Sequence, residues 1–143
     1  MILPDLNLLL YAYNPFTPQH DRARAWWESA LNGCELIGLP HEVTLGFVRI
    51  ATNPRLGASA VSLAVARDVL NTWMEAPPIR VLLPKETHVM QVCKLMEQCK
   101  CSGALTSDAS LAVYAIENRA LLCSNDADFA RFPGLEWANP LLD

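Results

Sequence analysis

Four acidic residues stand where the chain is expected to pass from one element of secondary structure to the next. Asp5 follows the apolar run ILP and Asp126 follows ALLCS, whereas Glu42 and Asp108 lie at the start of HEVTLGFVRIAT and SDASLAVYAIENR. If strands and helices alternate along the chain, all four carboxylates reach the sheet edge at which α/β proteins bind ligands. Carboxylate oxygens are the ligands that hard divalent cations prefer. The positions of these acids therefore predict metal-dependent phosphodiester chemistry.

Clustered carboxylates repel one another, so we expect their pKa values to be raised until cations bind. Two Mg²⁺ ions, or Mn²⁺ in their place, would relieve this repulsion, one activating a water molecule for in-line attack and the other stabilising the leaving oxygen. This chemistry needs no nucleophilic side chain. The chain also lacks the G-x-S-x-G, P-loop and G-x-G-x-x-G patterns of other enzyme classes.

Each acid also has a purely structural explanation. Asp5 suits a helix cap, Asp108 suits the first turn of a helix beside a Ser107 cap, and two acids, Asp126 and Asp128, suit Asx turns. These explanations stay open for any single residue. The four acids together favour a common site, because two of them follow the most clearly buried strands.

Two arginines are candidates for contacts with phosphate. Arg49 lies seven residues after Glu42, so on a helix both side chains point in nearly the same direction. They form either a surface ion pair or a metal ligand next to a phosphate-binding arginine. Arg131, close to Asp128, is either a contact to a substrate phosphate or a solvated cation.

The remaining sequence supplies elements that position these side chains. Short apolar runs predict buried strands at ILP and ALLCS, a strand at IRVLL and an edge strand at LEWA, and a further apolar run, ELIGL, precedes a helix. Helices are expected after Asp5, from a Thr17 cap with Pro18 as first residue to Gly33, over roughly 40–52, 59–75 and 85–100, and from Asp108 onward. This alternation predicts an α/β fold, a three-layer α/β/α sandwich with a central, mainly parallel sheet.

Within the helix expected at 85–100, apolar spacing assigns four residues to the inward face: Val89, Val92, Cys93 and Met96. The five cysteines are an odd number, so we expect no disulfide framework and most of them as small core residues.

The bulk properties limit the class of protein. A chain of 143 residues fits one domain, expected at 1–143. No apolar run approaches the roughly 20 residues that span a bilayer, so we expect a soluble, cytoplasmic protein. The formal charge of −4 opposes binding to RNA, but two divalent cations in the acidic site would bring it to zero.

The chain resembles the PIN-domain family, and within it the VapC-type ribonuclease toxins of bacterial toxin–antitoxin systems. The resemblance extends over nearly the whole chain, from ILPDLNLLLYA through HEVTLGFVRIATNPRL to SDASLAVYAIENRALLCSNDADFARFPGLEWANPL. The family's acidic quartet falls on four residues: Asp5, Glu42, Asp108 and Asp126. Asp128 matches a frequent fifth acid, Ser124 stands where a threonine is more usual, and Asn7 matches a polar residue that steadies the first aspartate.

The resemblance implies a PIN-like fold and a Mg²⁺- or Mn²⁺-dependent endoribonuclease that hydrolyses RNA with a metal-activated water. It also implies a homodimer and a cognate antitoxin that places a basic side chain in the acidic pocket, where the side chain replaces the charge of the metal. Hydrophobic residues make up 52% of the chain, which suits a groove for an antitoxin helix.

Two other functions are compatible with the same residues. A haloacid-dehalogenase-like phosphatase also begins with a strand that ends in Asp, but it needs a second Asp two positions later, where this chain has Asn7. A catalytically silent PIN-like binding module has no reason to keep four mutually repelling acids. The nuclease is therefore the favoured interpretation.

Overall fold

A computed structural model describes residues 1–142 of the chain and builds them around a five-stranded sheet. Asp143, the last residue of the expected domain, lies outside the described residues. The strands are β1 (Ile2–Pro4), β2 (Ile37–Pro40), β3 (Ile79–Leu82), β4 (Leu121–Cys123) and β5 (Trp137–Ala138). They are ordered β3-β2-β1-β4-β5, and every neighbouring pair is parallel. The predicted parallel sheet is confirmed.

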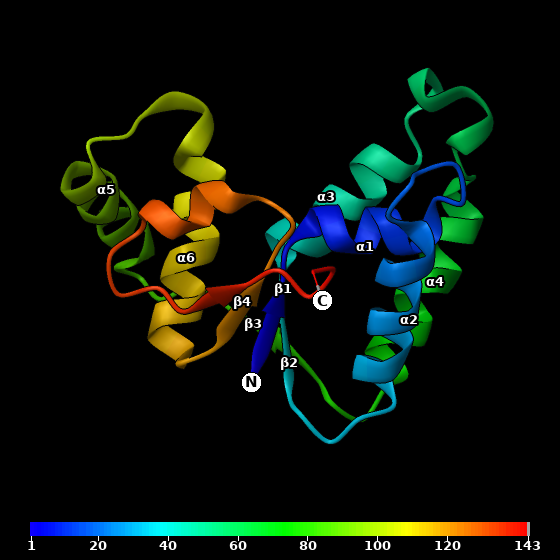
Figure 1. Cartoon of the computed structure of the whole chain (residues 1–143), viewed down its shortest axis with the longest axis horizontal. Helices are drawn as coiled ribbons and strands as arrows, with labels where there is room; N and C mark the ends of the chain where they lie inside the picture. Colours follow the sequence, from blue (N-terminus) through cyan, green and yellow to red (C-terminus); the bar gives the residue numbers. More distant parts are fainter. Residues whose placement is uncertain (143) are drawn as a thin grey trace.

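Six α-helices cover the two faces of the sheet: α1 (Leu6–Tyr13), α2 (His20–Leu31), α3 (His41–Ala51), α4 (Leu63–Glu75), α5 (His88–Cys99) and α6 (Thr106–Asn118). Figure 1 shows α5 and α6 on one side of the sheet and α1 to α4 on the other, which gives the three predicted layers. Residues 1–142 also contain three short 3₁₀ helices: η1 (Pro54–Ser59), η2 (Gly103–Leu105) and η3 (Ala127–Arg131).

The central strands are largely buried on both faces, as expected for a parallel sheet between helices, whereas Arg80 and Val81 of the edge strand β3 are exposed. Leu3, Ile37 and Leu122 are completely buried in the centre of the core. In register, Ile2 pairs with Ile37 on one side and with Leu121 on the other, so β1 lies in the middle of the sheet. Asp5, directly after β1, is therefore delivered to the centre of the sheet edge.

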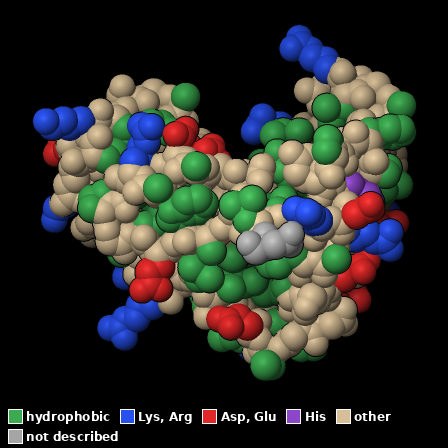
Figure 2. Space-filling model, viewed as in Figure 1, with side chains coloured by type: hydrophobic (Ala, Val, Ile, Leu, Met, Phe, Trp, Pro, Cys, Tyr) green, Lys and Arg blue, Asp and Glu red, His purple; other side chains and the backbone are tan. Residues whose placement is uncertain are grey.

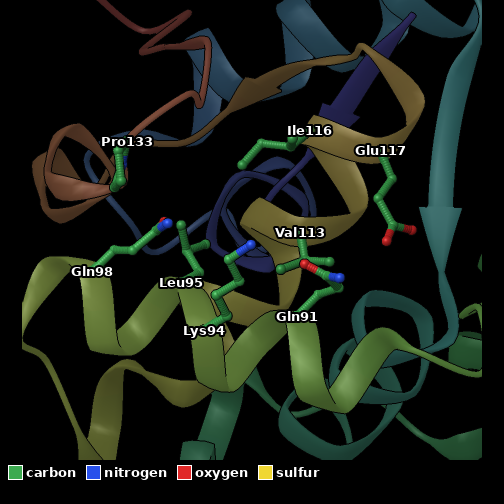
Figure 3. Close-up of a pocket in the computed structure, with 8 residues that line it drawn as sticks. All are labelled: Gln91, Lys94, Leu95, Gln98, Val113, Ile116, Glu117 and Pro133. Carbon is green, nitrogen blue, oxygen red and sulfur yellow. The ribbon is translucent and has the colours of Figure 1, made fainter.

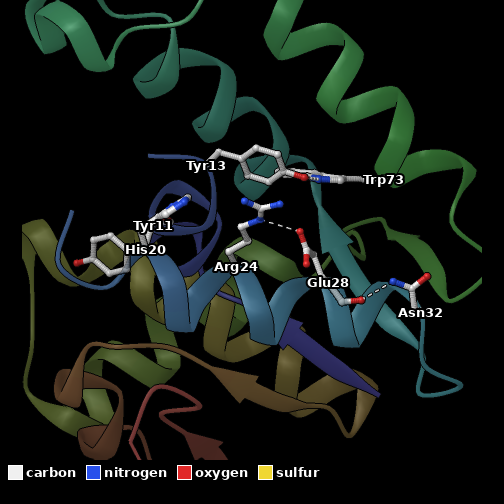
Figure 4. A network of polar contacts seen from close by, with 7 residues as sticks. All are labelled: Tyr11, Tyr13, His20, Arg24, Glu28, Asn32 and Trp73. Carbon is white, nitrogen blue, oxygen red and sulfur yellow. Dashed lines mark hydrogen bonds and ion pairs between the residues drawn. The ribbon is translucent and has the colours of Figure 1, made fainter. Parts of the chain in front are cut away.

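An aromatic cluster holds α1, α2, α3 and α4 together. Trp73 of α4 is completely buried and packs edge-on against Trp27 and Phe47, with ring centroids 5.4 Å and 4.8 Å apart. Its indole N–H donates to the Tyr13 hydroxyl at 2.8 Å, so this buried polar group is satisfied. Figure 4 shows this bond beside the exposed ion pair on α2 between Arg24 and Glu28.

The starts of two helices differ from the sequence prediction. Helix α2 begins at His20 and not after a Thr17 cap, because the Thr17 hydroxyl instead donates to the Asn14 carbonyl at the end of α1. Helix α4 begins four residues later than expected, since the Ser62 side chain accepts the Val65 N–H at 3.1 Å and caps it. The preceding residues form η1 instead.

The inward face of α5 also differs from the prediction. Val89 and Cys93 are exposed, whereas His88, Val92 and Leu95 are the buried residues of this helix. The helix is thus rotated by about one residue, and a histidine occupies the inward position in the first turn.

The predicted role of the cysteines is only partly correct. Cys34 is exposed and Cys123 is buried. Cys99 and Cys101 place their sulfur atoms against each other at the end of α5, and this single local pair is not the disulfide framework that we expected to be absent. Within residues 1–142, none of the helices combines the length and the apolar character that crossing a bilayer would require.

Candidate active site

The carboxyl ends of the strands open into a hollow between the two groups of helices. Figure 2 shows this hollow in the molecular surface, with acidic side chains on its flank. It contains a pocket of about 340 Å³ lined by the residue that follows β1 and by residues from α1, α3 and α6: Asp5, Leu6, Glu42, Val43, Arg49, Ser107, Asp108 and Leu111. Three of the four predicted acids thus line one pocket, and Arg49 lies with them.

A glycine allows α3 to approach the start of α1 closely enough for this arrangement. A Cβ atom on Gly46 would lie 2.6 Å from a methyl group of Leu6, the residue after Asp5. No larger residue fits without movement, so Gly46 lets α3 bring Glu42 and Arg49 beside the end of β1.

Asp5 is buried and held by Ser124, the residue that follows β4. The Ser124 hydroxyl donates to the Asp5 carboxylate at 2.6 Å and accepts from the Asn7 amide at 3.2 Å and from the Asp126 N–H at 3.0 Å. The hydroxyl thus makes one donated and two accepted hydrogen bonds, which is the full number that it can form. The side chain of Asn7 therefore reaches Asp5 through Ser124, whereas the backbone of Asn7 helps to lower the pKa of Asp5.

The electrostatics of the pocket show uncompensated negative charge. Burial raises the pKa of Asp5, the hydrogen bond from Ser124 opposes this, and the charge of Asp126 adds to the rise. Burial and the charges of Asp5, Asp126 and Asp128 raise the pKa of Asp108 from 3.8 to about 6. The charge of Asp126 thus raises the pKa of both Asp5 and Asp108, although Asp126 does not line the pocket.

Asp126 and Asp128 lie on the turn that opens η3. The Asp126 carboxylate accepts the Asp128 N–H at 2.8 Å, which is the Asx-type contact that formed the alternative explanation for this residue. Asp128 is exposed and forms an ion pair with Arg131 at 3.2 Å. Arg131 is therefore occupied by a carboxylate, while its charge still lowers the pKa of Asp108.

Two of the structural alternatives for single acids are not seen. Asp5 is the N-cap residue of α1 but makes no capping hydrogen bond through its side chain. Ser107 lies inside α6, which begins at Thr106, and so does not cap the helix. Within residues 1–142, Arg49 forms no ion pair with Glu42, although both line the pocket.

Glu42 has partners that the sequence did not indicate. Its carboxylate accepts the Ser110 hydroxyl at 2.7 Å, and Ser110 in turn contacts the His88 ring nitrogen Nε2 at 2.8 Å. Ser110 lies two residues after Asp108, a spacing that could have marked it. His88 carries no such signal, because only the packing of α5 against α6 brings it to the site.

The donor set suits a divalent cation in chemistry and in charge. All four predicted ligands are carboxylates, and the raised pKa values of Asp5 and Asp108 reflect a repulsion that a cation would relieve. In the described part of the chain, no three such side chains converge closely enough to hold one ion. A shared ion would therefore need Asp108 or Asp126 to move closer to the carboxylates of Asp5 and Glu42, which hydrogen bonds already hold in place.

A second pocket, between α5 and α6, does not have this character. Figure 3 shows its lining, in which Lys94 and Glu117 are the only charged residues labelled. Its volume is about 190 Å³. A single carboxylate facing a lysine offers no ligand cluster, so the acidic pocket is the candidate site.

Comparisons with known proteins identify the family and agree with the fold. The model of the PIN domain family matches residues 2–135. Ribonuclease VapC33 of Mycobacterium tuberculosis is 41% identical over 141 residues, which cover 99% of each chain. Ribonuclease VapC37 of the same organism is 32% identical over 140 residues, covering 98% of this chain and 97% of the relative.

Solved structures with the same fold are more distant in sequence. VapBC2 of Rickettsia felis, bound to a promoter DNA fragment, has a TM-score of 0.69 at 19% identity and covers 97% of this chain and 98% of its own. VapC20 of M. tuberculosis, described as a toxin that cleaves the sarcin–ricin loop, has a TM-score of 0.69 at 13% identity, with coverages of 95% and 99%.

Proposed function

Because the chain belongs to the PIN-domain family, and within it to the VapC ribonucleases, we propose that it is a divalent-metal-dependent endoribonuclease and the toxin of a toxin–antitoxin pair. The pocket that unites Asp5, Glu42 and Asp108 at the carboxyl edge of the sheet is the observation that carries this proposal. We assign the activity to one domain over residues 1–143, acting on RNA in the cytoplasm.

In this proposal, Asp5, Glu42, Asp108 and Asp126 hold Mg²⁺, which Mn²⁺ can replace, and Asp128 adds a fifth carboxylate. The bound cation supplies a water molecule of lowered pKa and neutralises charge on the phosphate. Burial of Asp5 and its hydrogen bond from Ser124 already fix the direction of this carboxylate. Binding of a cation would therefore cost no further rotational freedom at Asp5.

The arginines at the pocket would contact the RNA. Arg49 lines the pocket and stands where a phosphate oxygen would approach the acids. Arg131 must first leave Asp128, an exposed partner whose contribution is small, about 0–1 kcal/mol. Binding of RNA therefore competes with only a weak internal ion pair.

The expected partners are a cognate antitoxin and a second copy of the chain. An apolar groove of about 300 Å³ runs between α1, α3, η1 and α4, and Phe47, Ile50 and Val65 are among its lining residues. Exposed apolar surface of this kind suits the apolar face of an antitoxin helix. A basic side chain of the antitoxin, placed among the repelling carboxylates, would then block the site.

Cleavage of labelled total cellular RNA tests the proposal. Purified chain, free of antitoxin, is incubated with Mg²⁺, Mn²⁺ or EDTA beside Asp5→Asn and the control Asp21→Asn, whose side chain is exposed on α2. We expect discrete metal-dependent cuts by the wild type and the control, and none by Asp5→Asn. A folded wild type that cuts nothing with either metal would favour the silent binding module, and an active Asp5→Asn would remove Asp5 from the mechanism.

A further inference from the structure

The Glu42 carboxylate ends a chain of hydrogen bonds that begins inside the protein. His88 of α5, Ser110 of α6 and Glu42 of α3 are linked by contacts of 2.8 Å and 2.7 Å. His88 and Ser110 are 6% and 8% exposed, whereas the Glu42 side chain is 42% exposed. Three separate elements therefore meet at one partly exposed carboxylate.

The direction of these bonds follows from the hydrogen atoms available. An ionised carboxylate only accepts, so Ser110 gives its single hydroxyl hydrogen to Glu42. Its remaining lone pairs then accept the hydrogen on Nε2 of His88. Nδ1 of the same ring is buried and has no hydrogen-bond partner in the described part of the chain, which favours the Nε2–H tautomer.

The ring of His88 is fixed by its surroundings. It packs against Tyr114, one helical turn beyond Ser110 on α6, with ring centroids 4.3 Å apart. A buried imidazole with one unpartnered nitrogen is a costly way to fill space, and an apolar residue would pack there without that cost. The one hydrogen bond that the ring makes through its side chain leads to Ser110 and so to Glu42.

The same device holds the other fixed carboxylate of the pocket. Ser124 donates to Asp5 at 2.6 Å as Ser110 donates to Glu42 at 2.7 Å. Asp5 is also immobilised by burial, but Glu42 has three rotatable side-chain bonds and open solvent beside it. Without Ser110 the Glu42 side chain would populate directions that point away from the pocket.

We propose that His88 and Ser110 are positioning residues that hold the Glu42 carboxylate toward the acidic pocket in readiness for a divalent cation. The inference rests on the proposed function and deepens it, because it names residues that act through a metal ligand and never touch the substrate. Partners that orient metal ligands in this way typically contribute 10- to 100-fold, roughly, to metal affinity or activity.

Binding of Mn²⁺ provides a test that does not depend on cleavage. Free Mn²⁺ is titrated into the purified chain and followed by electron paramagnetic resonance, for wild type, Ser110→Ala, His88→Leu and His88→Gln. We expect the first two variants to bind Mn²⁺ about 10- to 100-fold more weakly and to lower kcat more than they raise KM for RNA. His88→Gln should recover most of the affinity, because its amide places a donor near the position of Nε2.

A double-mutant comparison separates positioning from general stability. In a Glu42→Ala background, Ser110→Ala should weaken Mn²⁺ binding no further, since its target is gone. Thr72→Ala on α4 likewise removes one hydroxyl, but this hydroxyl donates to the Asp68 carbonyl of its own helix; the variant serves as the control and should bind Mn²⁺ like the wild type. If His88→Leu does not fold, a comparison of Ser110→Ala with Ser110→Thr tests the positioning role instead. Ser110→Thr keeps the hydroxyl and should therefore bind Mn²⁺ more tightly than Ser110→Ala.

Several outcomes would overturn the inference. Equal Mn²⁺ affinity in wild type and Ser110→Ala would do so, as would an equal loss in the Glu42→Ala background or a wild type that binds no Mn²⁺. A chain that binds Mn²⁺ tightly and loses it in Ser110→Ala, yet cuts no RNA, would support the positioning role while refuting the nuclease.

Discussion

Replacing Asp108 by asparagine should make the metal-free protein more stable. Asp108 lies in the first turn of α6, where burial and three neighbouring carboxylates raise its pKa from 3.8 to about 6. Because the folded chain holds this proton more tightly than the unfolded chain, the stability of the wild type falls as pH rises from 3.8 through about 6. The cost is then fully present above pH 6 in the absence of a cation, and asparagine avoids it.

The size of this effect is limited by exposure and by the helix. A rise from 3.8 to about 6 would correspond to about 3 kcal/mol if all of it appeared as folding free energy. Solvent at the partly exposed side chain screens the repulsion, and the start of α6 favours a negative charge by about 0.3–1 kcal/mol. We therefore expect Asp108→Asn to gain about 1–2 kcal/mol, or roughly 3–8 °C in melting temperature.

Urea unfolding in EDTA between pH 3.5 and 8 measures this gain. The free-energy difference between variant and wild type should be close to zero below pH 3.8 and should grow until about pH 6. With saturating Mg²⁺ the wild type should become the more stable of the two proteins, because its Asp108 carboxylate binds the ion and the asparagine of the variant does not. Asp21→Asn, also an acid in a first helical turn, should gain nothing at any pH. A variant that is less stable than wild type in EDTA at pH 7.5, or a difference independent of pH, would refute the repulsion.

Two further perturbations examine the phosphate contact and the core. Arg49→Ala should raise KM for RNA several-fold with little change in kcat. In filter binding, it should also reduce the slope of log affinity against log salt concentration by about 0.7. An unchanged slope would show that Arg49 is an ordinary surface cation. Trp73→Ala should lower the free energy of unfolding in urea by about 3–5 kcal/mol, because Trp73 is completely buried among three aromatic rings. The control Trp26→Ala, at a half-buried position, should lower it much less. Equal losses would show that the aromatic cluster does not anchor α4.

The sheet and its order of elements were predictable because buried parallel strands leave a strong signal. ILP and ALLCS are continuous apolar runs, and each is followed at once by an acid or a hydroxyl that closes the strand. The strand ends then fix where Asp5 and Asp126 lie, whatever the details of the helices. The joint position of Glu42 and Arg49 followed in the same way from helical spacing, and Gly46 between them packs against Leu6 of α1.

Helix starts were predicted less well, because they depend on which of several competing hydrogen bonds forms. Thr17 followed by Pro18 matches the pattern of a helix start, but the Thr17 hydroxyl donates to the carbonyl of Asn14 three residues earlier. Ser59 and Ser62 were both possible caps for α4, and Ser62 takes the role because η1 includes Ser59. Such choices are decided by differences of about 1 kcal/mol, which propensity alone does not resolve.

The error in α5 has a different origin and points back to the site. Apolar periodicity placed Val89 inward, yet the structure turns Val89 to solvent and places His88 against Tyr114 and Ser110. A prediction from hydrophobic spacing considers only the burial of apolar side chains. In α5, the position that would bury Val89 is instead taken by His88, whose hydrogen bond to Ser110 leads to Glu42. Local rules are expected to fail where a residue is retained for something other than packing. The rotation of α5 and the proposed positioning of Glu42 are thus two consequences of the same buried residue, which is why His88→Leu should stabilise or preserve the fold while it weakens the binding of Mn²⁺.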